Sequence, residues 1–92
     1  MANAKREIVL DTETTGLSAA GGDRIVEIGC VEIVGGIRTG RTFQRYINPQ
    51  CSMPTKAFEV HGLSDLFLAA HPTFAEIAAD FLAFIGDAPL II

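Results

Sequence analysis

The amino-acid sequence predicts a domain that mixes strands and helices, α/β or α+β in class. Three apolar stretches rich in β-branched residues come first, one helical pattern follows, and a short apolar run comes last. With 92 residues, of which 49% are apolar and 20% charged, the chain has the composition of one small packed domain and not of a disordered segment.

The first three stretches predict an antiparallel meander of strands. A strand that begins near Ile8 is followed by a loop over residues 17–23 and a second strand over residues 24–34. The pair Gly35–Gly36 tolerates positive φ at both positions, which is typical of a tight hairpin turn. The turn leads into a third strand over residues 37–47.

The segment after the meander predicts short helices and, later, one more strand. Asn48 and Pro49 end the third strand, because proline cannot donate to a strand ladder. Residues 55–60 and 64–69 predict two short helical turns. Residues 89–92 are apolar and predict the start of a buried strand.

A longer helix is predicted from Thr73 to a glycine cap at Gly86. Thr73 and Glu76 have the spacing of a capping box, in which each side chain accepts a hydrogen bond from an exposed backbone N–H at the helix start. Apolar residues recur on one helical face, and Phe84 is expected near the core with them: Phe74, Ile77, Ala78, Phe81, Leu82 and Ile85.

Two carboxylates follow the first apolar run directly. Asp11 and Glu13 are two residues apart, so on a strand their side chains point to the same face. A divalent cation offsets the repulsion between such carboxylates, and hard oxygen ligands suit Mg²⁺ or Mn²⁺. Gly16 lets the chain leave the strand without a side chain crowding the site. From the pair alone, a solvated strand end remains an alternative.

The whole string of residues 8–16, Ile-Val-Leu-Asp-Thr-Glu-Thr-Thr-Gly, resembles the first exonuclease motif of the DEDD superfamily of 3'-to-5' exonucleases. Within that superfamily it is similar to the proofreading exonucleases of bacterial DNA polymerase III. Residues 57–63 resemble the Val-His-Gly segment after the third strand of these proteins, and residues 72–76 resemble the start of their next helix. Residues 89–92 resemble the strand that leads into their second motif.

The resemblance implies a ribonuclease H-like exonuclease fold and hydrolysis of the 3'-terminal nucleotide of DNA with two Mg²⁺ or Mn²⁺ ions. It implies that Asp11 bridges both ions and that Glu13 binds the ion beside the attacking water. Thr12, Thr14 and His61 are the expected contacts to the terminal nucleotide. The implied partners are the 3' end of single-stranded DNA and the catalytic subunit of DNA polymerase III.

The resemblance extends from about Arg6 to Ile92 and places residues 1–92 as the N-terminal portion of an exonuclease domain. In the superfamily a second motif, His-Asn-Ala-x-Phe-Asp, follows the strand that matches residues 90–92. A later motif supplies a general-base histidine and a fourth carboxylate. With two of four acidic ligands and no base, the 92-residue chain is expected to be inactive or nearly so.

Three alternatives remain open at this point. Asp11, Glu13 and Thr15 have the spacing of a haloacid-dehalogenase-type phosphatase motif, although a hairpin follows where that class has a helical crossover or cap. A non-catalytic fragment or polymerase-binding module is the second alternative. A related DEDD exonuclease that acts on RNA is the third, since these enzymes share the first motif.

Charge and cysteine content limit the remaining classes. The net charge of −4 disfavours broad electrostatic binding of nucleic acid, and no run of 18 apolar residues predicts a membrane span. Cys30, in an apolar strand, and Cys51, in a polar loop, are expected to be free thiols in a reducing cytoplasm. Residues 1–6 lack the apolar core of a signal peptide. Glu27 and Glu32 are expected on opposite faces of the second strand, where one can pair with an arginine.

Overall fold

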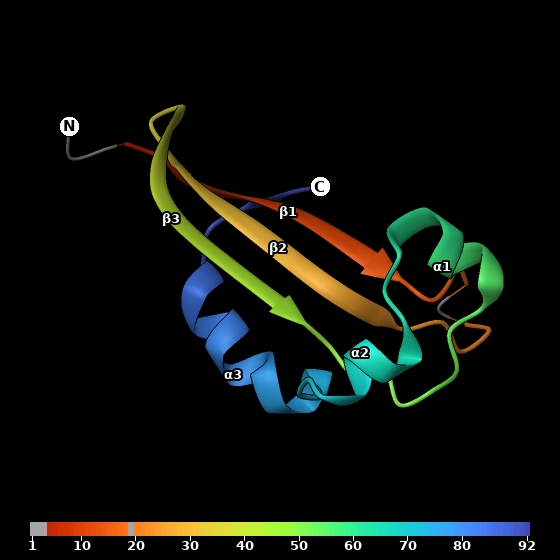
Figure 1. The fold of residues 1–92 in the computed structure, drawn as a ribbon. Coiled ribbons are helices and arrows are strands. Elements are labelled where there is room, and N and C mark those ends of the chain that lie inside the picture. The colour runs from red at the N-terminus through yellow and green to blue at the C-terminus, as the bar shows by residue number, and fades with distance from the viewer. Residues whose placement is uncertain (1–3, 19) are drawn as a thin grey trace.

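The computed structural model describes residues 4–18 and 20–92 (Figure 1). Residues 1–3 of the N-terminal segment that was compared with a signal peptide, and residue 19 of the predicted loop, lie outside the described residues. Four strands form one sheet in the order β3-β2-β1-β4. The elements, in chain order, are β1 (Arg6–Thr14), β2 (Ile25–Val34), β3 (Ile37–Tyr46), α1 (Thr55–His61), α2 (Asp65–Ala69), α3 (Phe74–Ile85) and β4 (Leu90–Ile91).

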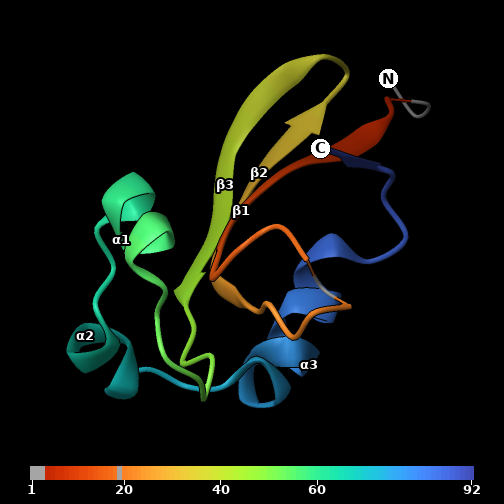
Figure 2. The same cartoon turned by 90° about the vertical axis from the view of Figure 1, so that its right-hand side faces the viewer.

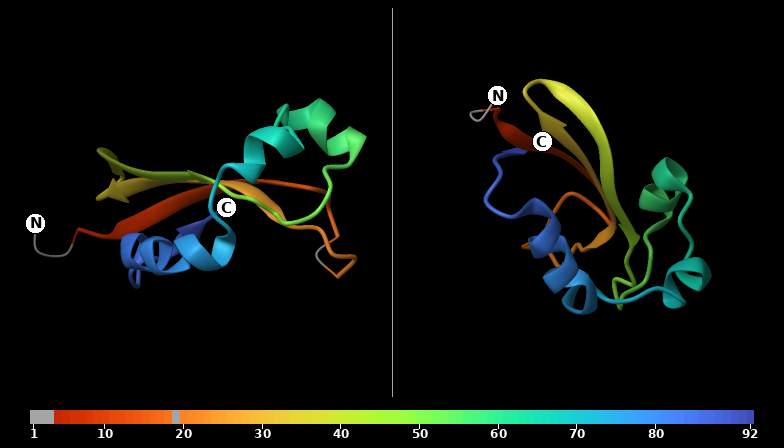
Figure 3. Two further views of the ribbon diagram at one scale, coloured as in Figure 1. Left: turned by 60° about the horizontal axis from the view of Figure 1, so that its bottom comes forward. Right: turned by 90° about the vertical axis from the view of Figure 1, so that its left-hand side faces the viewer.

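The helices lie on opposite faces of the sheet. Figure 2 and the left view of Figure 3 show α3 on one face and the α1–α2 pair on the other, beside the end of β1. The molecule is elongated, 48 × 24 × 23 Å, because the β2–β3 hairpin extends beyond the part that α3 covers. Within the described residues, no helix is long and apolar enough to cross a membrane.

The predicted meander is confirmed, and its hairpin turn is the predicted glycine pair. β1 pairs antiparallel with β2, and β2 with β3. Gly35 and Gly36 have φ of 59° and 80°, the left-handed values that a two-residue hairpin of this type requires. Cys30 is buried and Cys51 exposed, and both are free thiols as expected.

The last strand differs from the prediction. β4 pairs in parallel with β1, with Ile8 opposite Leu90 and Val9 opposite Ile91, but Leu90 and Ile91 are 41% and 43% exposed. The predicted burial of this strand is therefore wrong for the chain as described. β4 forms an edge of the sheet, and no described element packs over that edge.

The core lies between the sheet and α3. Along β1 and β2 alternate side chains point to this face, since strand side chains alternate between the two faces. The buried members of the core come from β1, β2, β3, the segment after it and α3: Ile8, Ile28, Cys30, Phe43, Ile47, Ile77 and Ile85.

Helix α3 begins and ends as predicted, but its buried face is rotated. The capping box at Thr73 is present, and the carboxylate of Glu76 accepts the Thr73 backbone N–H at 2.9 Å. Phe74 and Leu82, predicted as core residues, are 42% and 61% exposed. Phe84 packs against the core as predicted, and two guanidinium groups lie over its ring. This packing holds the Phe84 side of the helix against the sheet, so Leu82 turns toward solvent.

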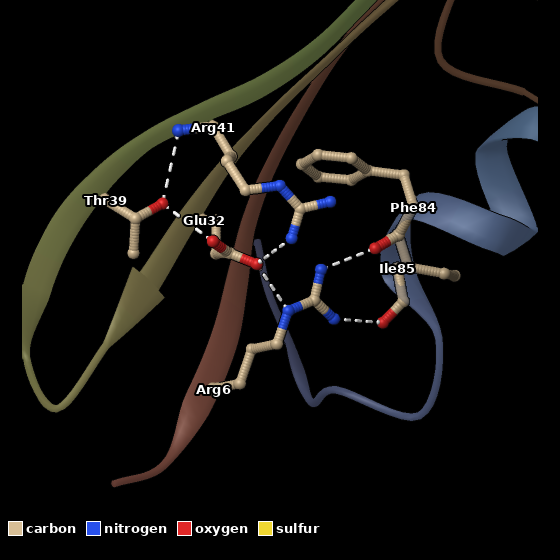
Figure 4. Close-up of polar contacts among 6 residues, drawn as sticks. All are labelled: Arg6, Glu32, Thr39, Arg41, Phe84 and Ile85. Carbon is tan, nitrogen blue, oxygen red and sulfur yellow. Dashed lines mark hydrogen bonds and ion pairs between the residues drawn. The ribbon is translucent and has the colours of Figure 1, made fainter.

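The carboxylate of Glu32 is buried on the core face of β2 with 4% exposure (Figure 4). Its Oε2 accepts hydrogen bonds from Arg6 Nε at 2.5 Å and from Arg41 Nη1 at 2.9 Å. Its Oε1 accepts the hydroxyl of Thr39 at 2.7 Å. Buried charge is stable only when it is paired and hydrogen-bonded, and these three donors meet that condition.

The same arginine also holds the carboxyl end of α3. Arg6 Nη1 donates to the carbonyl oxygen of Ile85 at 2.8 Å, and Arg6 Nη2 donates to that of Phe84 at 2.5 Å. The last carbonyls of a helix lack helical partners and carry partial negative charge, so a guanidinium is a fitting cap. Arg6 therefore joins β1, β2 and α3 through one side chain, as Figure 4 shows.

We predict that Glu32 makes folding sensitive to acid. Hydrogen bonds from Arg6 and Thr39 lower the pKa of Glu32, so the folded chain takes up a proton less readily than the unfolded chain. Its stabilisation is complete above the ordinary glutamate pKa of about 4.3 and is lost as the pH falls through the lower folded-state value. When thermal unfolding is followed from pH 7 to pH 3, the melting temperature should fall once the pH is below about 4.3.

In Glu32→Gln the melting temperature at pH 7 should fall by several degrees and its acid dependence should flatten. Some acid dependence of the melting temperature should remain in Glu32→Gln, because the hydrogen bond from the Thr73 backbone also lowers the pKa of Glu76. Glu7→Gln is the matched control, since Glu7 lies on the same sheet and forms an ion pair with the exposed side chain of Lys5. An acid dependence identical to that of the unsubstituted chain would contradict the assignment.

Candidate metal and nucleotide site

Asp11 and Glu13 lie on the sheet face opposite the core. Ile8 of β1 is fully buried and Leu10 packs against the core under α3, so the odd-numbered residues of β1 face the other side. The prediction that both carboxylates share one face is therefore confirmed by the strand assignment. Helices α1 and α2 lie on this side of the sheet, near the end of β1 (Figure 3).

The neighbours of Asp11 leave its carboxylate accessible. Gly29 is its partner on β2, and a side chain added at Gly29 would meet no atom closer than the Asp11 carbonyl at 4.0 Å. Asp11 Oδ1 accepts the backbone N–H of Thr12 at 3.0 Å. In the described part of the chain, Asp11 forms no ion pair. The open space opposite Asp11 leaves room for an ion or a substrate group.

Glu13 faces a second glutamate across the strands. Glu27 is its partner on β2, and Gln44 of β3 donates its Nε2–H to Glu27 Oε2 at 2.8 Å. Like charges directly opposite each other on a sheet are destabilising, and a bound cation would offset this repulsion. The ladder shifts register after this pair, since Thr14 is opposite Ile25. Such bulges re-aim side chains, often beside active sites.

These carboxylates fit part of a metal site. Their oxygens are the ligands that Mg²⁺ and Mn²⁺ prefer. Within residues 4–18 and 20–92, however, no three groups among His, Cys, Asp and Glu come together closely enough to enclose an ion. Asp11 and Glu13 therefore offer one side of a coordination shell.

A cleft of about 670 Å³ lies beside Glu13, between the end of β1 and α1. Its volume suits a ligand the size of a nucleotide. Three predicted substrate contacts, Thr12, Thr14 and His61, line it, and so does Lys56. Contact between these residues and a nucleotide stays a prediction. A smaller hollow of about 400 Å³ lies against the start of α3 and is lined by no carboxylate.

His61 is engaged within the chain through both ring nitrogens. Its Nε2 lies 3.1 Å from the carbonyl oxygen of Thr14, and its Nδ1 accepts the backbone N–H of Leu63 at 3.1 Å. The second histidine, His71, follows α2 and is half-buried against the rings of Tyr46 and Phe67. This packing fixes α2 on the open face of the sheet.

The loop after β1 is organised by Asp23, which the sequence analysis did not single out. Asp23 Oδ1 accepts the hydroxyl of Thr15 at 2.9 Å, and Oδ2 accepts the backbone N–H of Ser18 at 2.9 Å. A side chain at Gly16 would place its Cβ 2.5 Å from Asp23 Oδ2. The glycine is thus needed for the close approach of Asp23, and not for an unusual φ. No spacing in the sequence signals this contact.

We predict that Gly16→Ala lowers the free energy of unfolding by about 1–2 kcal/mol, because the new methyl group displaces the hydrogen-bonded Asp23 carboxylate. In an Asp23→Ala background the obstacle is absent, so adding Gly16→Ala should cost little. Urea unfolding of the four proteins in this double-mutant cycle measures the coupling. Gly29→Ala is the control for glycine replacement, and equal costs of Gly16→Ala in both backgrounds would rule out the proposed contact.

Comparison with known proteins finds an exonuclease family, in agreement with the resemblance of residues 8–16. The family model described as Exonuclease (RNase_T) matches residues 8–92. The chain is 56% identical over 87 residues to the DNA polymerase III subunit epsilon of Rickettsia conorii, and 47% identical over 91 residues to that of Escherichia coli. Each match covers 95% of this chain, but the chain spans only 38% and 37% of those relatives.

Solved structures share the fold at low sequence identity. The nuclease domain of 3'hExo, a DEDDh family member solved with rAMP bound, matches with a TM-score of 0.74 at 17% identity, over 91% of this chain and 45% of that one. Product-bound exonuclease I matches with a TM-score of 0.79 at 18% identity, over 94% and 21%. The predicted ribonuclease H-like exonuclease fold is confirmed.

The phosphatase alternative is not supported. Thr15, the third residue with that spacing, is 3% exposed, and its hydroxyl donates to Asp23 Oδ1 within the loop after β1. A hairpin meander follows β1, and the family model matches residues 8–92. Both observations agree with the prediction of an exonuclease fold. By its sequence and its fold, this chain belongs to the exonuclease family.

Proposed function

We propose that the chain contributes Asp11 and Glu13 to a metal-dependent 3'-to-5' exonuclease that proofreads DNA as the epsilon subunit of a bacterial DNA polymerase III. The observation that carries the proposal is the pair of carboxylates on the open sheet face beside a nucleotide-sized cleft. Relatives that carry the name DNA polymerase III subunit epsilon, at up to 56% identity, support the choice of DNA replication over RNA processing.

Asp11 and Glu13 are the proposed ligands of Mg²⁺ or Mn²⁺. A divalent ion would supply an activated water and neutralise charge on the scissile phosphate. The residues of this chain would hold and orient the ion: the two carboxylates bind it, and Gly29 leaves space for it opposite Asp11. Thr12, Thr14 and His61 border the cleft in which we place the terminal nucleotide. The 3' end of single-stranded DNA and the polymerase catalytic subunit are the proposed partners.

We further propose that residues 1–92 form the N-terminal portion of the exonuclease domain and precede its second motif. The two-carboxylate site supports this, since the described residues bring no third His, Cys, Asp or Glu side chain together with this pair. The share of 38% that the chain covers in its relatives is in accord. Sequencing the source gene past the codon for Ile92 tests the boundary, and a frame that continues without His-Asn-Ala-x-Phe-Asp would contradict it.

Metal binding by the 92-residue chain is the first expected outcome. Titration with Mn²⁺ should broaden the backbone amide NMR signals of residues 11–13 and Gly29 ahead of all others, because a paramagnetic ion relaxes nearby nuclei. Asp11→Asn and Glu13→Gln should each weaken binding by about tenfold or more, ~1.4 kcal/mol. Glu7→Gln, at the other end of the same strand face, should leave binding unchanged.

Broadening that is diffuse, or that persists in Asp11→Asn, would contradict the assignment of the metal ligands. Localised broadening that is insensitive to Glu13→Gln would leave Asp11 as the ligand and remove Glu13 from the site.

Catalysis by the isolated chain is expected to be absent. With 5'-labelled single-stranded DNA and Mn²⁺, shortening from the 3' end should not exceed that seen with Asp11→Ala, which reports contaminating nuclease. A matched RNA oligonucleotide tests the RNA alternative in the same assay. Activity on DNA that Asp11→Ala abolishes would refute the incomplete-site proposal, and a similar result on RNA alone would favour the related exonucleases.

A further inference from the structure

Helix α1 is attached to the sheet by few contacts. None of its residues is buried, and its N-cap residue, Pro54, makes no side-chain capping bond. Figure 1 shows α1 beside the arrowhead of β1, where it forms one wall of the cleft next to Glu13. In the described ranges, the hydrogen bond between His61 and the Thr14 carbonyl is the one that joins α1 to β1.

The hydrogen bonds of His61 define a single tautomer. The Leu63 backbone N–H is a donor, so Nδ1 of His61 accepts and carries no proton. The Thr14 carbonyl oxygen can only accept, so Nε2 must carry the ring proton and donate it. Gly62, with φ of 72°, makes the left-handed turn that brings Leu63 back over the ring.

The acceptor of this hydrogen bond, the Thr14 carbonyl, lies next to a proposed metal ligand and at an irregularity of the β1–β2 ladder. Thr14 follows Glu13 directly and stands where the β1–β2 ladder shifts register. Its hydroxyl donates to the carbonyl oxygen of Gly16 at 2.6 Å. Thr14 is therefore held through its own side chain on one side and through His61 on the other. Fixing its carbonyl fixes both the end of β1 and the distance to α1.

We infer that His61 is a positioning residue: it ties the wall α1 to Thr14 and so sets the width of the cleft and the orientation of Glu13. With both nitrogens engaged, only the carbon edges of the ring remain to meet a nucleotide. The family resemblance suggests a contact between His61 and the terminal nucleotide, and this geometry restricts such a contact to the ring carbons. The inference rests on the proposed function in one respect, namely that Asp11 and Glu13 bind the metal.

The histidine ring gives a direct readout in the unsubstituted chain. Long-range ¹H–¹⁵N NMR distinguishes the two neutral tautomers, and His71 serves as the internal reference. We expect His61 in the Nε2–H form, with a ring proton protected from exchange. Addition of Mg²⁺ and a deoxynucleoside monophosphate should leave that tautomer and its proton unchanged. An Nδ1–H tautomer, or rapid averaging between the two tautomers, would overturn the inference. So would a change of the acceptor of the Nε2–H bond from the Thr14 carbonyl to the nucleotide when the nucleotide is added.

Variants test the link between His61 and the carboxylates. Gln can still donate to the Thr14 carbonyl, so His61→Gln should keep Mn²⁺ binding within about twofold, whereas His61→Ala should weaken it about three- to tenfold. Glu59→Ala, an exposed change on the same helix, is the control. Equal binding by His61→Ala and the unsubstituted chain would also overturn the inference.

The two proposals fail separately in these experiments. Loss of localised Mn²⁺ broadening in the unsubstituted chain counts against the metal ligands, and so against the proposed function. The tautomer and its response to nucleotide still decide the role of His61 in that case, because they need no bound metal and no substitution that could unfold the chain.

Discussion

The buried carboxylate of Glu32 is the contact through which the layers of this small domain are joined. It accepts hydrogen bonds from Arg6 of β1 and from Thr39 and Arg41 of β3, and Arg6 continues to the last carbonyls of α3. A lone carboxylate in this position would be strongly disfavoured, so the partners must assemble together. The arrangement also fixes where α3 ends, and hence where β4 can return beside β1.

The two faces of the sheet therefore have different roles, one in stability and one in the candidate metal site. The face under α3 holds the apolar core and the Glu32 network, whereas the opposite face presents Asp11 and Glu13. Because β1 is fixed on its core side, its other face can carry repelling carboxylates without loss of strand geometry. Two local devices, Asp23 against Gly16 and His61 against Thr14, then hold the strand end and the cleft wall.

The sequence allowed the meander, the capping box and the shared face of Asp11 and Glu13 to be predicted, because each rests on a local period or turn preference. Parity placed Glu27 and Glu32 on opposite faces but could not choose Arg6, 26 residues away, as a partner. The exposure of Leu82 and of β4 depends on which elements pack beside them, and the His61–Thr14 bond spans 47 residues. Contacts of this range leave no spacing signal.

An anomalous difference map from crystals of this chain grown with Mn²⁺ would show whether the end of β1 is a metal site. We expect a peak within coordination distance of carboxylate oxygens of both Asp11 and Glu13, on the face away from α3, with the Glu32 network unchanged. A peak elsewhere on the chain, or none at these carboxylates at saturating Mn²⁺, would contradict the claim that this strand end is a metal site.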